Sequence, residues 1–445
     1  MLSCNSHIIF FKRIYCTAVK CKPVVSLEES TKQALDAGRY KPRQHEGRLT
    51  SGCISLPSSI VNAILKSCTD HPVKALLAEG AKLDNFLRSR KVPLERDELR
   101  KKIIECRKFV GDEFRDRFNT EEMTEEQLAY ANKVVEAQSK KRAKQQIYAW
   151  KPLDYDAYKS LEYLLGRSPA EFSVLMRIFE EIKKRDTEFK PRSFIDFGSG
   201  VGTGIWAVSN IWKENIFEYV LIDAASAMNE LAESLLRGGE MNKAMNLRNV
   251  FFRQFLPASH NKFDIVLSAF SLFELSSKKA RADVLENLWN KCDGYLVLVE
   301  QGSFAGYLLI EEARQFLLDK IAASGSDWHI FSPCPHHHQC PRLKLADGTP
   351  CNFESTYNKL PLGNHSEASK FLYSYVVFKK GLTNQTRFPR LVRPTLVRSK
   401  HSICRMCTEE GKLQEIIFTA TKHEKNLYRC ARSSKWGDLL PIKIT

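Results

Sequence analysis

The sequence predicts an α/β protein whose core is a mostly parallel, doubly wound β-sheet with helices on both faces. From about residue 193 onward, short runs rich in Val, Ile and Phe alternate with helical segments. Alternation of this kind is typical of a parallel sheet that is covered on both sides. The chain has 445 residues, 43% of them hydrophobic, which is enough for two or three domains that each bury a core.

The region before the sheet, residues 55–190, is predicted to be helical because its apolar residues recur at helical spacing. Thr124 and Gln127 form a capping box at the start of one helix. That helix ends in a basic run, Lys140, Lys141, Arg142 and Lys144. A solvated face near a helix C-terminus is the ordinary explanation of such a run, and contact with RNA phosphates is the alternative.

The last helix before the sheet is predicted from "RSPAEFSVLMRIFEEIKKR". Ser168 is placed as its N-cap, Pro169 at the first helical position, and Glu171 as the residue that closes the capping box. This helix leads directly into the first strand of the sheet.

The sheet domain is predicted over residues 191–381, from seven apolar runs. The runs read SFIDFG, YVLIDA, NVFFRQF, FDIVLSAF, GYLVLVE, DWHIF and FLYSYVVFKKG. Ligands of such sheets bind at the carboxyl ends of the strands. A cysteine-rich insertion, residues 332–351, falls between the last two strands, and residues 382–445 form a small, basic, β-rich C-terminal region.

The first 27 residues contain no Asp or Glu, and they place Lys12, Arg13, Lys20 and Lys22 around an apolar run. This pattern is typical of a mitochondrial presequence over residues 1–27, and a disordered basic start is the alternative. The apolar run is too short and too charged for a membrane span, and no other segment is long enough for one.

The charge balance favours a polyanionic partner. The chain has 68 basic and 52 acidic residues, a formal net charge of +16 and a pI near 9.2, which suits RNA or an anionic membrane surface. The C-terminal region supplies a candidate phosphate-contacting stripe, with a merely solvated surface as the alternative: Arg387, Arg390, Arg393, Arg398 and Lys400.

A glycine-rich loop follows the first strand of the sheet, in "FIDFGSGVGTGIWAV", with glycines at Gly198, Gly200, Gly202 and Gly204. Glycines there let the backbone turn tightly and approach a ligand. A dinucleotide fingerprint would need glycine at Thr203, whereas a strand-borne acid, Asp196, precedes G-x-G-x-G. The loop therefore resembles that of class I S-adenosylmethionine-dependent methyltransferases, with another nucleotide fold as the alternative.

That resemblance implies roles for two carboxylates. Asp196 would help to orient the methionine amino group of the cofactor, and Asp223, which ends the second strand, would hold the ribose hydroxyls. The cofactor-binding residues are thus Asp196, Gly198, Gly200, Gly202 and Asp223.

No catalytic residue is predicted. Where enzymes that methylate exocyclic base nitrogens carry N-P-P-Y or D-P-P-Y, this sequence has "SAFSLFEL". Cys292, the nearest candidate for carbon-5 pyrimidine methylation, precedes the fifth strand at its wrong end. Glu274 could act as a base, although a solvent-facing role at a helix start is favoured for it.

Five of the thirteen cysteines suggest a metal site in a reducing compartment. Cys334, Cys340 and Cys351 are spaced C-x5-C-x10-C, and the tail adds Cys404 and Cys407. Spacing alone favours zinc over an iron–sulfur cluster, with free buried cysteines third. The neighbouring histidines at 336–338 are possible zinc ligands, but three consecutive histidines in a loop are more often solvent-exposed, and the favoured interpretation is that they are bystanders.

Several motifs together resemble the methyltransferase-like 17 family of mitochondrial small-ribosomal-subunit assembly factors, over roughly residues 60–445. They are "DFGSGVGTGIWA", "LFELSS", "LVLVEQGSFAG", "CPHHHQCP", "CTEEGKLQ" and "LYRCARSSKWGDLLP". The resemblance implies S-adenosylmethionine binding, contact with small-subunit rRNA and ribosomal proteins, and a mitochondrial matrix location. It also implies a [4Fe–4S] cluster on Cys334, Cys340, Cys351 and Cys407, with Cys404 as the alternative fourth ligand.

The leading hypothesis is therefore an assembly factor whose methyltransferase fold is inactive or weakly active. A true rRNA methyltransferase is the first rival. A small-molecule methyltransferase that is basic for reasons unrelated to RNA is the second.

Overall fold

The computed structural model of the protein describes residues 23–50, 52–118, 122–146, 150–362, 368–383 and 386–444. The predicted presequence, residues 1–27, lies mostly outside these ranges. Its last residues belong to β1 (Val25–Leu27), which pairs with the C-terminal strand β14 (Ile442–Ile444).

The central sheet has eight strands, and their order along its main path is β4-β3-β2-β5-β6-β9-β7, with β8 paired to β9. The strands are β2 (Ser193–Phe197), β3 (Glu218–Ile222), β4 (Val250–Arg253), β5 (Phe263–Ala269), β6 (Cys292–Gln301), β7 (Trp328–Ser332), β8 (Phe353–Asn358) and β9 (Ala368–Lys380). Strands β2 to β6 are parallel, and β9 runs antiparallel to β6 and β7. This order, with one reversed strand inserted before the last, is that of class I methyltransferases, so the predicted fold class is confirmed. All seven predicted strands are present, and β8 is an eighth that the apolar pattern does not predict.

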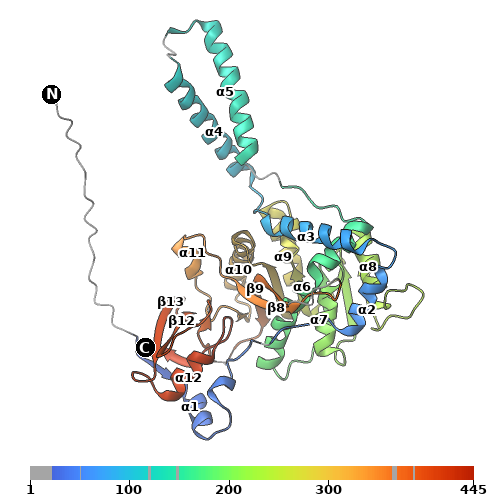
Figure 1. The fold of residues 1–445 in the computed structure, drawn as a ribbon, viewed down its shortest axis with the longest axis vertical. Helices are drawn as coiled ribbons and strands as arrows, with labels where there is room; N and C mark the ends of the chain where they lie inside the picture. Colours follow the sequence, from blue (N-terminus) through green and yellow to red (C-terminus); the bar gives the residue numbers. More distant parts are fainter. Residues whose placement is uncertain are drawn as a thin grey trace, which may run out of the picture.

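Helices cover both faces of the sheet (Figure 1). One face packs against α2 (Ser58–Ser67), α6 (Ala157–Arg185), α7 (Thr203–Trp212) and α8 (Ser226–Leu236). The other face packs against α9 (Lys278–Asn290) and α10 (Phe304–Ser324). Each face contributes its own hydrophobic core, as expected for a sheet whose strands read as continuous apolar runs.

Helix α6 is longer than predicted and differs at its start. It is continuous from Ala157 to Arg185, is capped by Asp156, and carries Pro169 in its interior, so the predicted N-cap at Ser168 is wrong. The Ser168 hydroxyl instead donates to the Leu164 carbonyl at 2.6 Å within the helix. Burial of both residues between the sheet and its neighbours outweighs the local start signal, because packing can compensate for the bond that proline removes.

Helix α3 (Val73–Ser89) packs against α6 with its backbone in close contact. A Cβ at Gly80 would lie 2.7 Å from the Glu162 carbonyl oxygen, and a Cβ at Gly166 would lie 2.4 Å from the Gly80 carbonyl oxygen. Only glycine fits at this crossing.

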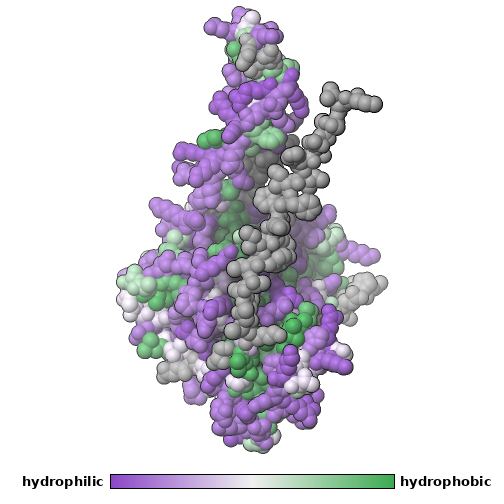
Figure 2. Space-filling model, turned by 90° about the vertical axis from the view of Figure 1, so that its left-hand side faces the viewer, coloured by the Kyte–Doolittle hydropathy of each residue, from purple (hydrophilic) through white to green (hydrophobic). Residues whose placement is uncertain are grey.

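Helices α4 (Arg96–Arg117) and α5 (Glu125–Gln146) form an antiparallel hairpin that projects away from the body of the molecule (Figure 1). The predicted capping box is present: the Thr124 amide donates to Gln127 Oε1 at 2.9 Å, and the Gln127 amide donates to Thr124 Oγ1 at 3.4 Å. In Figure 2 the hairpin forms the upper part of the molecule, and its surface is mostly hydrophilic.

The C-terminal region contains a four-stranded sheet formed by β10 (Arg390–Leu391), β11 (Leu396–Val397), β12 (His401–Cys407) and β13 (Leu413–Thr419). Helix α12 (Lys425–Ser433) follows. The N-terminal elements α1 (Glu29–Asp36) and η1 (Pro42–Gln44) lie beside this region in Figure 1, and Leu27 and Leu35 belong to its core. The two ends of the described chain therefore build one module together.

A buried ion pair joins this module to the sheet domain. Arg390 Nη2 lies 2.6 Å from Glu181 Oε1, and both side chains are buried. Arg185 reaches the same carboxylate at 2.7 Å. Arg390 is only 2% exposed, so the predicted phosphate-contacting stripe is wrong at that residue. The reason is that its charge is committed to Glu181, whose pKa falls to about 2 because the charges of Arg390 and Arg185 outweigh the effect of burial.

No helix in the described ranges is both long enough and apolar enough to cross a lipid bilayer.

Candidate functional site

A cavity of about 390 Å³ opens at the carboxyl ends of β2, β3 and β5, where the strand order reverses. Of the five predicted cofactor-binding residues, Gly198, Gly200 and Asp223 line it. Asp196 and Gly202 are not part of its lining. The first two glycines of the predicted loop thus face the cavity, and so does Asp223 at the end of the second strand.

The glycine loop has a backbone that few other residues could adopt. Gly198, Gly200 and Gly202 have φ values of 72°, 50° and 94°. A Cβ at Gly198 would also lie 2.5 Å from the Ser271 Cβ. The amides of Gly198 and Ser199 donate to the Ile222 carbonyl, at 2.8 and 3.0 Å, which fixes the loop to the end of β3.

Asp223 is held at the cavity wall by two backbone amides. Its Oδ2 accepts from Gly200 at 2.9 Å and its Oδ1 accepts from Ala225 at 2.9 Å. Burial raises the pKa of this carboxyl, while the two amide bonds oppose the rise. Each carboxylate oxygen keeps a lone pair for further donors, so the group can accept from two hydroxyls of a ligand.

Asp196 is 2% exposed and lies beneath the loop, where a Cβ at Gly204 would come within 2.1 Å of its Oδ2. Its Oδ1 is buried and has no hydrogen-bond partner in the described part of the chain. Burial, and then the charge of Asp223, raise the pKa of Asp196 well above its usual value. An unpaired buried acceptor beside the glycine loop fits a donor group supplied by a ligand.

Glu274 is partly exposed, but it stands at the end of a short helix rather than at the start of one, which corrects part of the favoured interpretation. It lies in η3 (Leu272–Glu274) at the cavity wall and forms an ion pair with Arg90, whose Nη2 is 3.2 Å from Oε2. Cys292 begins β6, so it lies at the amino ends of the parallel strands, at the end of the sheet opposite the cavity. Burial raises the pKa of its thiol to about 12.

Four cysteines line a second, smaller cavity between the sheet domain and the C-terminal region. They are the four predicted metal ligands, Cys334, Cys340, Cys351 and Cys407. Cys334 follows β7, Cys340 precedes α11 (Pro341–Leu345), Cys351 precedes β8, and Cys407 ends β12. Cys404, three residues earlier on β12, points instead into the C-terminal core and contacts the Ala431 carbonyl.

The cysteine cavity has polar contacts on its sulfur atoms. The Tyr307 hydroxyl donates to Cys340 Sγ at 3.2 Å, and His336 Nε2 lies 3.2 Å from Cys407 Sγ. His336 is 1% exposed, so the interpretation that all three histidines are solvent-exposed is wrong at this residue. The sequence does not show which of the three adjacent histidines is buried, because that depends on the path the loop takes in the folded protein.

Burial raises the pKa of the Cys334 thiol to about 11, although the Arg314 charge opposes the rise. The pKa of Cys407 is well above its usual value because of burial and the other three sulfurs. Thiolates here would need a compensating cation. In the part of the chain that the structure describes, no group of three or more His, Cys, Asp or Glu side chains is arranged to hold a metal ion.

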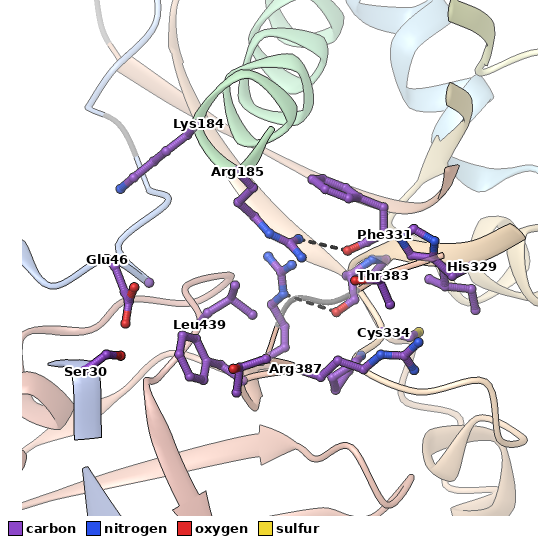
Figure 3. Close-up of a pocket in the computed structure, with 17 residues that line it drawn as sticks. Ser30, Glu46, Lys184, Arg185, His329, Phe331, Cys334, Thr383, Arg387 and Leu439 are labelled. Carbon is purple, nitrogen blue, oxygen red and sulfur yellow. Dashed lines mark hydrogen bonds between the residues drawn. The ribbon is translucent and has the colours of Figure 1, made fainter. Parts of the chain in front are cut away.

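A third cavity, of about 480 Å³, lies at the seam between the two modules and is lined partly by cations (Figure 3). Arg185 donates to the Phe331 carbonyl at 2.8 Å, as drawn there, and Lys184 Nζ donates to the Arg48 carbonyl at 2.5 Å. Arg387, from the predicted stripe, also lines it. Because Arg185 and Arg390 share the single carboxylate of Glu181, this positive charge is balanced only in part.

Comparison with known proteins gives a clear family match. The family model for "Mitochondrial small ribosomal subunit Rsm22" matches residues 157–441. The human "Ribosome assembly protein METTL17, mitochondrial" is 35% identical over 407 residues, which cover 90% of this chain and 86% of that protein. The Saccharomyces cerevisiae "Ribosome assembly protein RSM22, mitochondrial" is 20% identical, over 60% of this chain and 64% of that protein.

Solved structures resemble the sheet domain only loosely. A SAM-dependent methyltransferase from Aquifex aeolicus is 15% identical, covers 50% of this chain and 99% of its own, and has a TM-score of 0.30. The fold assignment therefore rests on the strand order described above.

Proposed function

The chain belongs to the mitochondrial small ribosomal subunit Rsm22 family, and on that premise we propose that it is an assembly factor of the mitochondrial small ribosomal subunit. In this proposal it acts in the matrix, binds the maturing subunit through its rRNA and ribosomal proteins, and holds S-adenosylmethionine and a [4Fe–4S] cluster without transferring a methyl group. The observation that carries the proposal is the similarity to a human mitochondrial ribosome assembly protein, at 35% identity over 90% of this chain. The net charge of +16 supports contact with a polyanion.

The cavity at the carboxyl ends of β2 and β3 supports S-adenosylmethionine binding. Bound there, the cofactor would supply an activated methyl group. Asp223 would accept from its ribose hydroxyls, and the backbone of the glycine loop, which carries no side chains at Gly198 and Gly200, would let its methionine part approach closely. The unpaired Oδ1 of Asp196 fits the amino group of the methionine moiety.

The cysteine cavity supports a cluster bound by Cys334, Cys340, Cys351 and Cys407. Four thiols from separate segments line one space, and Cys404 points elsewhere. A [4Fe–4S] cluster distributes its thiolates over four iron atoms, so it needs a wider ligand spacing than a single zinc ion does. The cluster would tie the loop after β7 to β12 and so stabilise the seam between the modules.

Two features favour an inactive fold over an active rRNA methyltransferase, the second candidate. Glu274 is paired with Arg90, and Cys292 lies at the amino end of β6, away from the cavity. The feature that favours the active enzyme is the cofactor cavity itself, which is lined by Gly198, Gly200 and Asp223 and has Asp196 buried beside it.

Gradient sedimentation of a mitochondrial lysate tests the assembly role. The protein should comigrate with the small subunit and its precursors, and small-subunit levels should fall when it is depleted. A protein found only in the free fractions, with normal subunit levels after depletion, would contradict the role.

Mapping of base methylation in small-subunit rRNA separates the two candidates. Cells that carry Asp196→Ala together with Gly200→Arg are compared with wild type. Unchanged methylation is expected; loss of one mark while subunits still assemble would instead identify an active enzyme.

A further inference from the structure

We propose that the α4–α5 hairpin is an RNA-docking arm whose two connections to the body carry the effect of docking to the cofactor cavity. The inference rests on the proposed function, because it takes RNA as the partner and S-adenosylmethionine as the ligand of the cavity. It goes further by naming the surface that meets RNA and its coupling to the second ligand.

Both connections of the hairpin line the cofactor cavity. Leu87 and Arg90, which precede α4, are part of its wall, and so are residues 152–155, which follow α5. The segment after α5 also carries Trp150, which anchors it. A force on the arm would therefore reach this wall through Arg90 and Trp150.

The two connections are anchored to the same atom. Arg90 Nη2 donates to the Phe273 carbonyl oxygen at 3.0 Å, and Trp150 Nε1 donates to that oxygen at 2.8 Å. Phe273 lies in η3, and it lines the cavity next to Glu274, the partner of Arg90. One carbonyl in the cavity wall thus holds both attachments of the arm.

The arm packs mainly against itself. Arg142 of α5 stacks on the Phe109 ring of α4, with its guanidinium carbon 3.7 Å from the ring centroid. Within the described residues, each of the two helices packs extensively only against the other. Their outer faces therefore remain available to a partner (Figure 1).

Charge is segregated along the arm. The half nearer the body has nine basic residues and three acidic ones, in residues 96–108 and 139–142. The described residues of the outer part, 109–118 and 122–126, include six acidic residues and two arginines. The exposed basic side chains of the inner half are Arg96, Arg100, Lys101, Lys102, Arg107, Lys108, Lys140 and Lys141.

This pattern fits a phosphate backbone seated on the inner half of the arm. Residues 96–108 of α4 span about 20 Å, so several phosphates can be met at once. The acidic outer part repels RNA, which confines the RNA to the side of the body. An acidic protein surface would match the same lysines, and the test below distinguishes it.

Docking of the arm should strengthen cofactor binding. When the arm is bound to RNA, both of its connections are restrained, and with them part of the cavity wall. The cofactor then binds to a wall that is already ordered, which lowers the entropic cost of binding. Linkage then requires that S-adenosylmethionine strengthen RNA binding by the same factor.

The first measurement is the affinity of the full-length protein for an RNA hairpin with a duplex stem, across a salt series. The test variant combines Lys101→Glu, Lys102→Glu, Lys108→Glu and Lys141→Glu. The matched control makes the same charge change at exposed lysines elsewhere, as Lys262→Glu, Lys359→Glu, Lys422→Glu and Lys425→Glu. The test variant should bind RNA more weakly, and its salt slope should fall by about one for each phosphate that it no longer neutralises. Equal RNA affinities of the test variant and the control would overturn the proposal that the arm binds RNA, and would point to a protein partner for these lysines.

The second measurement is the dissociation constant of S-adenosylmethionine with and without the RNA hairpin. Saturating RNA should lower it by about fivefold or more in wild type. Trp150→Phe removes the indole N–H but keeps an aromatic ring, so it should reduce that factor while each ligand alone still binds. No change on adding RNA would overturn the coupling and leave the cofactor assignment intact. Failure of wild type to bind S-adenosylmethionine at all would overturn the cofactor assignment as well.

Discussion

The cofactor cavity and the cysteine cavity are built in opposite ways. The five predicted cofactor-binding residues of the first lie close together in the chain, within residues 196–223, and its acid Asp223 is satisfied by backbone amides nearby. The second takes its four cysteines from segments up to seventy-three residues apart and lies at a seam that the Arg390–Glu181 pair closes. A site of the first kind can lose its ligand and keep its shape. A site of the second kind depends on the packing of two modules.

The largest effect should come from Cys407→Ser. We expect it to remove nearly all bound iron, because the fourth thiolate is removed while the other three are crowded in one cavity. Anaerobic purification followed by iron, sulfide and zinc analysis and absorption spectroscopy measures this. Cys404→Ser is the matched control on the same strand and should keep its iron. One zinc and no iron in the wild type would contradict the cluster.

Next in size is Glu181→Ala, which tests how far the seam depends on its buried ion pair. The change leaves Arg390 buried without its carboxylate, and we expect the free energy of unfolding to fall by about 3–5 kcal/mol. Chemical denaturation measures the loss. Glu180→Ala, at the preceding position of α6, is the control and should cost much less. Equal losses for the two variants would show that the seam does not depend on this pair.

At the cofactor cavity, Asp223→Asn should weaken S-adenosylmethionine binding by about tenfold to a hundredfold, because a charged acceptor is replaced by a neutral amide. Isothermal titration calorimetry measures the affinity. The unfolding free energy should change little, in contrast to Glu181→Ala. Asp264→Asn, at the amino edge of the same sheet, is the control and should bind as wild type does.

A smaller effect concerns pH. Burial raises the pKa of Glu300, at the end of β6, to about 8, although it accepts from the Leu272 amide at 2.8 Å. The native state therefore keeps a proton that the unfolded chain releases near pH 4.5. The contribution of Glu300 to the free energy of unfolding is therefore largest below about pH 4.5. It falls by up to about 1.4 kcal/mol per pH unit until about pH 8 and is constant above that.

Glu300→Gln should remove this contribution, since an amide does not titrate in this range. The difference in unfolding free energy between variant and wild type, measured from about pH 5 to about pH 9, gives the result. A constant difference across that range would show that Glu300 is ionised in the folded protein.

The sequence by itself determined the sheet and the glycine loop. The predicted strands are apolar runs, and those at the centre of the sheet, β2, β3, β5 and β6, are mostly buried, so their pattern is local. The positive φ values at Gly198, Gly200 and Gly202 favour glycine whatever surrounds them, so the loop can be predicted from a short stretch of sequence.

Tertiary structure decided the rest, because burial is not a local property. The basic pattern of the tail predicts a surface charge at Arg390, whereas Glu181, more than two hundred residues away, holds it inside. Ser168 carries a helix-start signal inside a continuous helix, because packing on both sides outweighs it. The common anchor of Arg90 and Trp150 on Phe273, and the union of the two chain ends in one module, arise only when distant segments fold against each other.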